Sequence, residues 1–254
     1  MQQKNRTEIM SLTFENLSSG EYLSLIEKRL KNGKQTVIFT PNTQILMKCK
    51  SDTRLLKILK TADIILPDGS GIVIASHIMK SPIKERVCGI DMAEDILRVA
   101  QIKGYSLFLL GGNPQSVFYA KENINKKYPN IKICGYHHGY FKKSGIENSL
   151  IKQKISRAAP DILFVCFGFP LQESWIVKNI KSNELSSVKL AMGLGGSIDV
   201  WSGKSKRAPK IFQALCMEWL WRAILEPRRL KIIVDIPRFL IYITYYSNMK
   251  RRFE

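Results

Sequence analysis

Short apolar runs alternate along the chain with longer stretches in which apolar residues recur every three or four positions. Runs rich in β-branched and aromatic residues are typical of strands, and the longer spacing is typical of amphipathic helices. The predicted strands are Thr36–Phe39, Asp63–Leu66, Ser106–Leu110, Ile131–Cys134, Asp161–Phe167 and Val188–Met192. Helical patterns lie between them, at Thr53–Lys60, Asp91–Ala100 and Pro114–Tyr128.

The predicted strands are almost continuously apolar, which indicates a sheet that is buried on both faces. Strands that alternate with helices favour parallel pairing, with helices as the crossovers. The pattern therefore predicts an α/β fold with a Rossmann-like, mostly parallel sheet and helices on both faces. A length of 254 residues suits one large domain, with or without an appendage.

The composition changes near Gly203, so we predict a core over residues 1–202 and an appendage over 203–254. The second segment holds twelve Lys and Arg against four Asp and Glu, a net charge of +8. Its apolar stretches fall short of the roughly 20 clean residues that span a bilayer. Basic amphipathic helices with Trp, Tyr and Phe are typical of the surface of an anionic membrane. Alternatively, their apolar face packs on the core or on another subunit.

The whole chain carries a formal charge of +19, which predicts an anionic partner: nucleic acid, anionic lipid or a phosphorylated substrate. The first ten residues contain no apolar segment of the kind found in signal peptides, which favours a cytoplasmic location. The five cysteines are scattered and form no C-x-x-C pair, so we expect reduced, structural thiols. The pair His137-His138 has no acidic or cysteine neighbour at metal-ligand spacing, which favours a polar loop.

Glycines follow four of the six predicted strands, where each strand should lead into a helix. Such glycines allow the backbone to approach a ligand closely and to present N–H groups to phosphate oxygens. Neither G-x-G-x-x-G nor the P-loop pattern is present, which disfavours a dinucleotide-binding enzyme and an NTPase. The loops predict one large phosphorylated ligand, and their glycines are Gly69, Gly111, Gly112, Gly168, Gly195 and Gly196.

Asp68 ends one of these strands, in the sequence Ile-Ile-Leu-Pro-Asp-Gly-Ser-Gly over residues 64–71. Open α/β sheets bind ligands at the carboxyl edge of their strands, so a carboxylate there can face a substrate. Alternatively, Asp68 begins the turn or caps the following helix.

The order and spacing of eight motifs resemble the WecG/TagA/CpsF family of bacterial glycosyltransferases over roughly Thr13 to Leu230. These motifs are Thr40-Pro41-Asn42, 67–71, 85–91, 168–173, 195–199, Arg207-Ala208-Pro209, 218–222 and Glu226-Pro227-Arg228-Arg229.

This resemblance implies an inverting transfer of an N-acetylhexosamine-type sugar, such as N-acetylmannosamine, from a UDP donor. It also implies a polyprenyl-diphosphate-linked sugar as acceptor, on the cytoplasmic leaflet of the plasma membrane, in teichoic acid, capsule or exopolysaccharide synthesis. Asp68 matches the family's candidate base, and Thr40, Asn42, Arg86 and Gln172 match pocket positions. The resemblance further implies a basic C-terminal appendage that reaches the membrane and completes the site with arginines.

The chemistry of the residues agrees with this picture. A single carboxylate can take the proton of the acceptor hydroxyl, because a diphosphate leaves without a second acid. The chain has no D-x-D triplet, so we expect no metal or other cofactor, with arginines and backbone N–H groups stabilising the leaving group. The candidate arginines are Arg86, Arg207, Arg222, Arg228 and Arg229.

Other interpretations stay open from the sequence. Thr40 and Asn42 could cap the helix that begins near Thr43. Asp91 and Asp199 fit structural carboxylates better than second bases. At the level of function, the alternatives are a nucleotide-binding oxidoreductase and a basic nucleic-acid binding module, although we expect no nucleic-acid partner. Surplus apolar surface on the appendage would suit self-association in solution.

Overall fold

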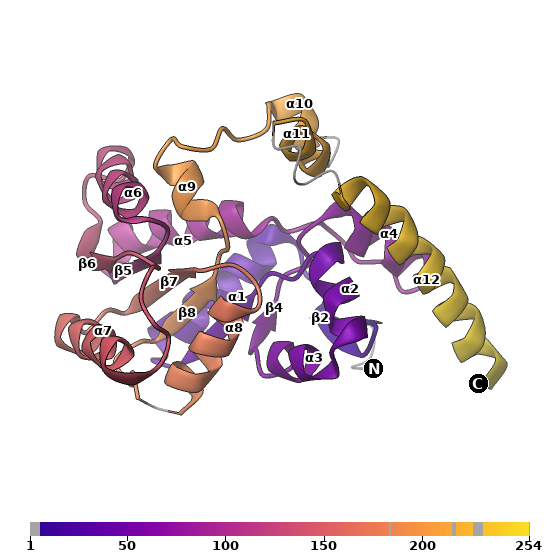
Figure 1. Cartoon of the computed structure of the whole chain (residues 1–254), viewed down its shortest axis with the longest axis horizontal. Coiled ribbons are helices and arrows are strands. Elements are labelled where there is room, and N and C mark those ends of the chain that lie inside the picture. Colours follow the sequence, from indigo (N-terminus) through magenta and orange to yellow (C-terminus); the bar gives the residue numbers. More distant parts are fainter. Residues whose placement is uncertain (1–5, 183, 215–216, 226–230, 254) are drawn as a thin grey trace.

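The computed structural model describes residues 6–182, 184–214, 217–225 and 231–253. Its centre is a six-stranded sheet in which every neighbouring pair is parallel, in the order β4-β3-β8-β7-β5-β6 (Figure 1). The predicted α/β fold is confirmed, and each predicted strand is present within a few residues of its expected bounds. The strands are β3 (Thr36–Phe39), β4 (Ile64–Ile65), β5 (Ser106–Gly111), β6 (Lys132–His137), β7 (Ile162–Cys166) and β8 (Leu190–Gly193).

Helices connect these strands, and several of the helices begin at residues that favour a helix N-terminus. Ser18 caps the first helix and forms a reciprocal capping box with Glu21. Asn113 caps a later helix, where Pro114 occupies the first turn. The helices of the core are α1 (Ser19–Lys31), α2 (Thr43–Ser51), α3 (Thr53–Leu59), α4 (Ser70–Ile78), α5 (Gly89–Lys103), α6 (Pro114–Lys127), α7 (Gly145–Ala158), α8 (Leu171–Ile176), which continues into the π-helix η2 (Val177–Lys181), and α9 (Ser197–Trp201).

Successive residues of each strand point into two separate hydrophobic clusters. Leu107 and Leu109 of β5 pack with α1, α5, α6 and α9, whereas Phe108 and Leu110 pack with the cluster of α2, α3, α7 and α8. This alternation is what a parallel sheet covered on both faces requires.

A two-stranded antiparallel hairpin precedes the sheet and was not predicted. Its strands are β1 (Arg6–Ile9) and β2 (Leu12–Glu15), with Ile9 opposite Leu12. The turn residues Met10 and Ser11 have φ angles of 51° and 60°, a conformation that Gly and Asn usually supply. The sequence therefore lacks the common hairpin signal at this position.

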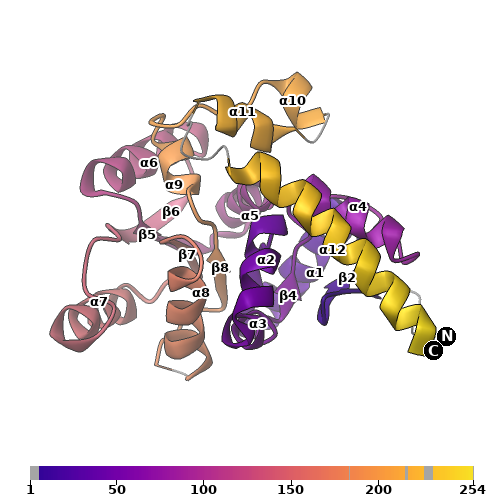
Figure 2. The ribbon, with the colours of Figure 1, turned by 45° about the vertical axis from the view of Figure 1, so that its right-hand side comes forward.

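The basic C-terminal segment forms α10 (Lys210–Ala214), α11 (Glu218–Leu225) and α12 (Lys231–Phe253), as Figures 1 and 2 show. Helix α12 crosses α2 and α4, and Phe239, Ile243 and Ser247 are buried on one of its faces. One apolar face of the appendage thus packs on the core, as one of the alternatives held. Another face is exposed, with Ile241 at 70% and Tyr245 at 63%.

Within the described part of the chain, no helix combines the length and apolar character needed to cross a bilayer. The division into a core over 1–202 and an appendage over 203–254 stays a prediction.

Candidate active site

The candidate site is built from the loops that follow β3, β4, β5, β7 and β8. Because all six strands are parallel, these loops emerge at the same edge of the sheet. The sequence-predicted residues of the core lie in these loops or in the first turns of the helices after them, apart from Arg86, which reaches this edge from the segment before α5.

The loop after β4 carries Asp68, which is half-buried, and its backbone N–H donates to the carbonyl of Leu66 at 2.9 Å. The N-cap residue of α4 is Gly69, at φ 105°, one residue after Asp68. A Cβ atom built on Gly69 would lie 3.5 Å from Cβ of Asn42, so the loops after β3 and β4 are in contact.

The loop after β3 holds Thr40 and Asn42, which have different local roles. Asn42 caps α2, because its Oδ1 accepts from the N–H of Ile45 at 3.1 Å, as the alternative reading predicted. The hydroxyl of Thr40 donates to the carbonyl of Gly193 at 3.4 Å, across to the end of β8. A residue larger than Gly at position 89 would approach the Thr40 side chain to 3.0 Å. Thr40 thus lies where three segments converge.

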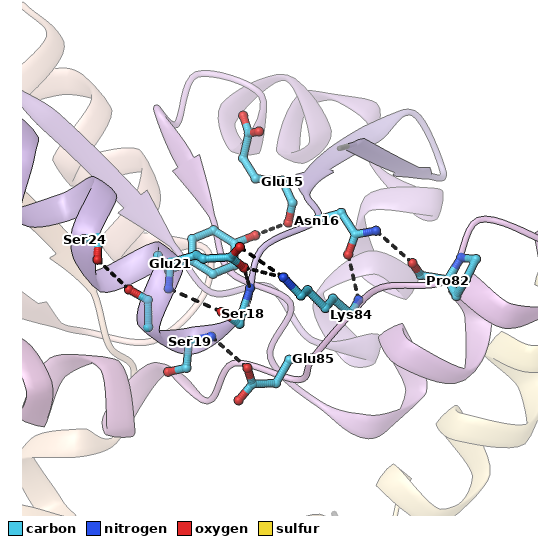
Figure 3. Close-up of polar contacts among 11 residues, drawn as sticks. Glu15, Asn16, Ser18, Ser19, Glu21, Ser24, Pro82, Lys84 and Glu85 are labelled. Atoms are coloured by element: carbon cyan, nitrogen blue, oxygen red, sulfur yellow. Dashed lines mark hydrogen bonds and ion pairs between the residues drawn. The ribbon is translucent and has the colours of Figure 1, made fainter. Parts of the chain in front are cut away.

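Arg86 reaches this edge on a segment that is held at both ends. Figure 3 shows the anchor on its N-terminal side, where Lys84 Nζ lies 2.8 Å from Glu21 and the N–H of Ser19 donates to Glu85 at 2.8 Å. On the other side, the N–H of Val87 donates to the carbonyl of Pro67 at 3.1 Å, immediately before Asp68. Arg86 is therefore fixed beside the loop that carries the candidate base.

A cluster of opposite charges surrounds Cys88, immediately after this segment. Burial raises the pKa of the Cys88 thiol, and Asp68, Glu218 and Asp91 raise it further, whereas Arg86 lowers it. Since each of these charges acts on one thiol, all four lie in one neighbourhood. Asp68 thus shares its surroundings with an arginine and with a carboxylate of the appendage.

Two ion pairs join the appendage to this cluster. Arg86 Nη2 lies 2.9 Å from Glu218 Oε2 at the start of α11, and both side chains are nearly buried, at 13% and 14% exposure. Arg207 pairs with Asp91 near the start of α5. Of the other predicted arginines, Arg228 and Arg229 lie outside the described residues, and only the backbone of Arg222 is described, in α11.

The loops after β7 and β8 are joined by the side chain of Gln172. Its Oε1 accepts from the N–H of Gly168 at 3.2 Å and from the N–H of Gly195 at 2.8 Å. The same side chain would lie 2.9 Å from a Cβ atom at Gly193, so a larger residue there would have to displace the Gln172 amide. Two of the amides that the sequence analysis assigned to a phosphate are therefore engaged by Gln172.

The loop after β5 is tightly packed. A Cβ atom at Gly111, whose φ is 142°, would approach the carbonyl oxygen of Cys166 to 2.3 Å, and one at Gly112 would approach Ile198 to 2.5 Å. The loop after β8 ends on Gly196, which is exposed at the start of α9. Gly111 and Gly112 need glycine because their neighbours leave no room and their φ is positive, whereas Gly196 has a φ of −87° and open space at its Cβ position.

The remaining polar candidates have structural contacts. Asp199 accepts from the hydroxyl of Ser116 at 2.8 Å, and the rings of His137 and His138 lie 4.3 Å apart at the end of β6. Cys49, Cys88, Cys134 and Cys166 carry free thiols, and Cys216 lies outside the described residues. Throughout the part of the chain that is described, no three His, Cys, Asp or Glu side chains are grouped so as to hold a metal ion.

Comparison with known proteins identifies the family. The sequence model of the Glycosyl transferase WecG/TagA/CpsF family matches residues 7–253. The chain belongs to this family. It is 32% identical, over 98% of its own length and 95% of theirs, to N-acetylglucosaminyldiphosphoundecaprenol N-acetyl-beta-D-mannosaminyltransferases from Staphylococcus aureus strains NCTC 8325 / PS 47 and COL. The chain is accordingly a glycosyltransferase, and the resemblance seen in its motifs is confirmed.

Two residues of this WecG/TagA/CpsF glycosyltransferase were missed in the sequence analysis. Glu218 pairs with Arg86, although the two are far apart in the chain. Glu173 is 2% exposed and accepts from Gln172 Nε2 at 2.8 Å. Both belong to motifs that were noticed, but acidic residues in helical segments ordinarily face solvent, so no sequence signal marked them.

Glu173 predicts a pH dependence of stability. Burial raises its pKa to about 7, against the opposing hydrogen bond from Gln172. Since the folded state holds this proton more tightly than the unfolded state, the stabilisation is complete below about pH 4.5 and is lost as the pH rises through 7. The loss amounts to about 3 kcal/mol, from about 1.4 kcal/mol per pKa unit.

Glu173→Gln removes this titration, so its free energy of unfolding should rise relative to that of the unmodified chain between pH 5 and pH 8. Denaturant unfolding at both pH values measures the difference. Parallel pH profiles for the two proteins would contradict the assignment.

Proposed function

We propose that this glycosyltransferase moves N-acetylmannosamine, or a closely related N-acetylhexosamine, from UDP to a polyprenyl-diphosphate-linked N-acetylglucosamine. The names of the Staphylococcus aureus relatives specify this sugar and this class of acceptor. The observation that carries the proposal is Asp68, half-buried at the carboxyl edge of β4 beside Arg86 and close to the appendage.

In the proposed reaction, Asp68 acts as the general base. Its carboxylate takes the proton of the acceptor hydroxyl while that oxygen attacks the anomeric carbon of the donor. The bond from the anomeric carbon to the diphosphate oxygen breaks, and UDP leaves with the electron pair. Attack from the face opposite UDP inverts the configuration, so one carboxylate is sufficient.

The departing diphosphate needs positive charge, and arginines supply it in this proposal. Arg86 and Arg207 bring guanidinium groups to the edge where Asp68 lies, and guanidinium pairs with phosphate oxygens through two hydrogen bonds. Arg222, Arg228 and Arg229 are proposed to add to them from the appendage. Backbone N–H groups of the glycine loops, other than those of Gly168 and Gly195 that donate to Gln172, are proposed to complete the stabilisation.

A peripheral position on the inner leaflet of the plasma membrane suits this acceptor. The exposed face of α12 carries Ile241 and Tyr245, and the chain around it is strongly basic. Such a surface favours the interface of an anionic membrane. The product would serve teichoic acid, capsule or exopolysaccharide synthesis, and self-association stays a prediction. The family assignment decides for a transferase over the oxidoreductase and the nucleic-acid binding module.

Asp68→Asn should lower kcat by about 100- to 10,000-fold, the usual contribution of a general base, while leaving the fold intact. Turnover is measured as UDP release from UDP-N-acetylmannosamine in the presence of the lipid-linked acceptor. Asp63→Asn is the matched control, because Asp63 lies just before the amino end of the same strand, β4. If Asp68→Asn keeps near-normal turnover, another group is the base.

The proposed chemistry uses no metal ion. Protein that has been dialysed against EDTA and assayed in its presence should keep its turnover, because arginines rather than a cation stabilise the diphosphate. Loss of turnover that Mg²⁺ or Mn²⁺ restores would contradict this part of the proposal.

A further inference from the structure

The side chain of Gln172 ties together two loops of the site, after β7 and after β8. It is 4% exposed, and its Oε1 receives the N–H groups of Gly168 and Gly195 at 3.2 and 2.8 Å. Both glycines have positive φ, 81° and 54°. One oxygen atom thus fixes the path of two loops that follow different strands.

The residue that follows Gln172 holds the amide from its other end, opposite the two glycine N–H groups. Gln172 Nε2 donates to Glu173 Oε1 at 2.8 Å, and the Glu173 side chain is 2% exposed. If the amide were reversed, its oxygen would face the oxygen of Glu173 and its NH₂ group would face two N–H donors. Glu173 therefore acts with the two glycine N–H groups to keep the Gln172 oxygen turned toward the two loops.

The position of Glu173 is costly for a carboxyl group. Among the described residues, its second oxygen, Oε2, has no hydrogen-bond partner. A buried polar atom without a partner costs free energy of folding. An apolar residue of similar size at this position would avoid that cost. An apolar residue could not reproduce the bond to Gln172.

We propose that Glu173 is a positioning residue for donor binding, which acts through Gln172 to hold the Gly168 and Gly195 loops in the shape that receives the diphosphate of the donor. The inference rests on the proposed function for its ligand. Glu173 itself touches neither substrate; its contribution is the orientation of one amide.

Four variants of the full chain test this role by donor kcat/KM. Glu173→Met keeps the length of the side chain but removes the acceptor, and should lower kcat/KM about 10- to 100-fold, as misplacement of a site by about 1 Å does. Glu173→Gln can still accept from Gln172 and should stay within about threefold of the unmodified chain. Gln172→Met should resemble Glu173→Met, and the double variant should be no worse than the poorer single variant, because the two residues act as one unit.

Leu171→Met is the matched control, since Leu171 lies on the same turn but is 56% exposed. Glu173→Asp provides a second test if Glu173→Met does not fold, because its carboxylate is one methylene too short for the 2.8 Å contact and should give a similar loss. Unchanged kcat/KM in folded Glu173→Met or Glu173→Asp would overturn the proposal. Losses in the two single variants that multiply in the double variant would overturn it as well.

Amide hydrogen exchange separates this inference from the proposed function. Exchange at Gly168 and Gly195 should be faster in Glu173→Met than in Glu173→Gln or Leu171→Met, because the Gln172 oxygen is no longer held against these amides. If the unmodified chain transfers no sugar from a UDP donor, the proposed function fails. The exchange rates of the two glycine amides still test the Gln172–Glu173 contact in that case. Unaltered exchange at both glycines would overturn the positioning role even in an active enzyme.

Discussion

Parallel pairing of all six strands is the constraint on which the site depends. It brings the ends of β3, β4, β5, β7 and β8 to one edge, although these strands are spread over about 160 residues of the chain. Polar contacts then fix the loops to one another, as between Thr40 and Gly193 or Gln172 and Gly195. Catalysis depends on the relative positions of the base, the diphosphate and the acceptor, and a mobile edge could not hold them in those positions.

Charge is balanced at this edge between core and appendage. Asp68 and Arg86 lie in the core, and Glu218 of α11 pairs with Arg86 in a nearly buried contact. When one partner of a nearly buried charge pair is removed, the other charge is left without compensation, which destabilises the folded protein. The appendage therefore does more than add a basic surface: it holds the arginine that stands beside the candidate base, while the other face of α12 remains exposed.

The sheet could be predicted from sequence because its strands are apolar runs of a kind that parallel sheets require, and the glycines at their ends marked the loops. The hairpin β1–β2 escaped prediction, since Met10 and Ser11 adopt positive φ without a glycine. The pairing of Arg86 with Glu218 and the burial of Glu173 escaped as well. Both depend on tertiary packing, which places an acidic side chain of a helix away from water, and periodicity alone does not report this.

The anomeric configuration of the product shows whether the enzyme carries out a base-assisted inverting transfer to a lipid-linked sugar. The full chain is incubated with α-linked UDP-N-acetylmannosamine and polyprenyl-diphosphate-N-acetylglucosamine, and the new linkage is determined by NMR. We expect a β-linked disaccharide, with UDP released only when the acceptor is present. An α-linked product, or UDP release at the same rate without acceptor, would rule out this mechanism.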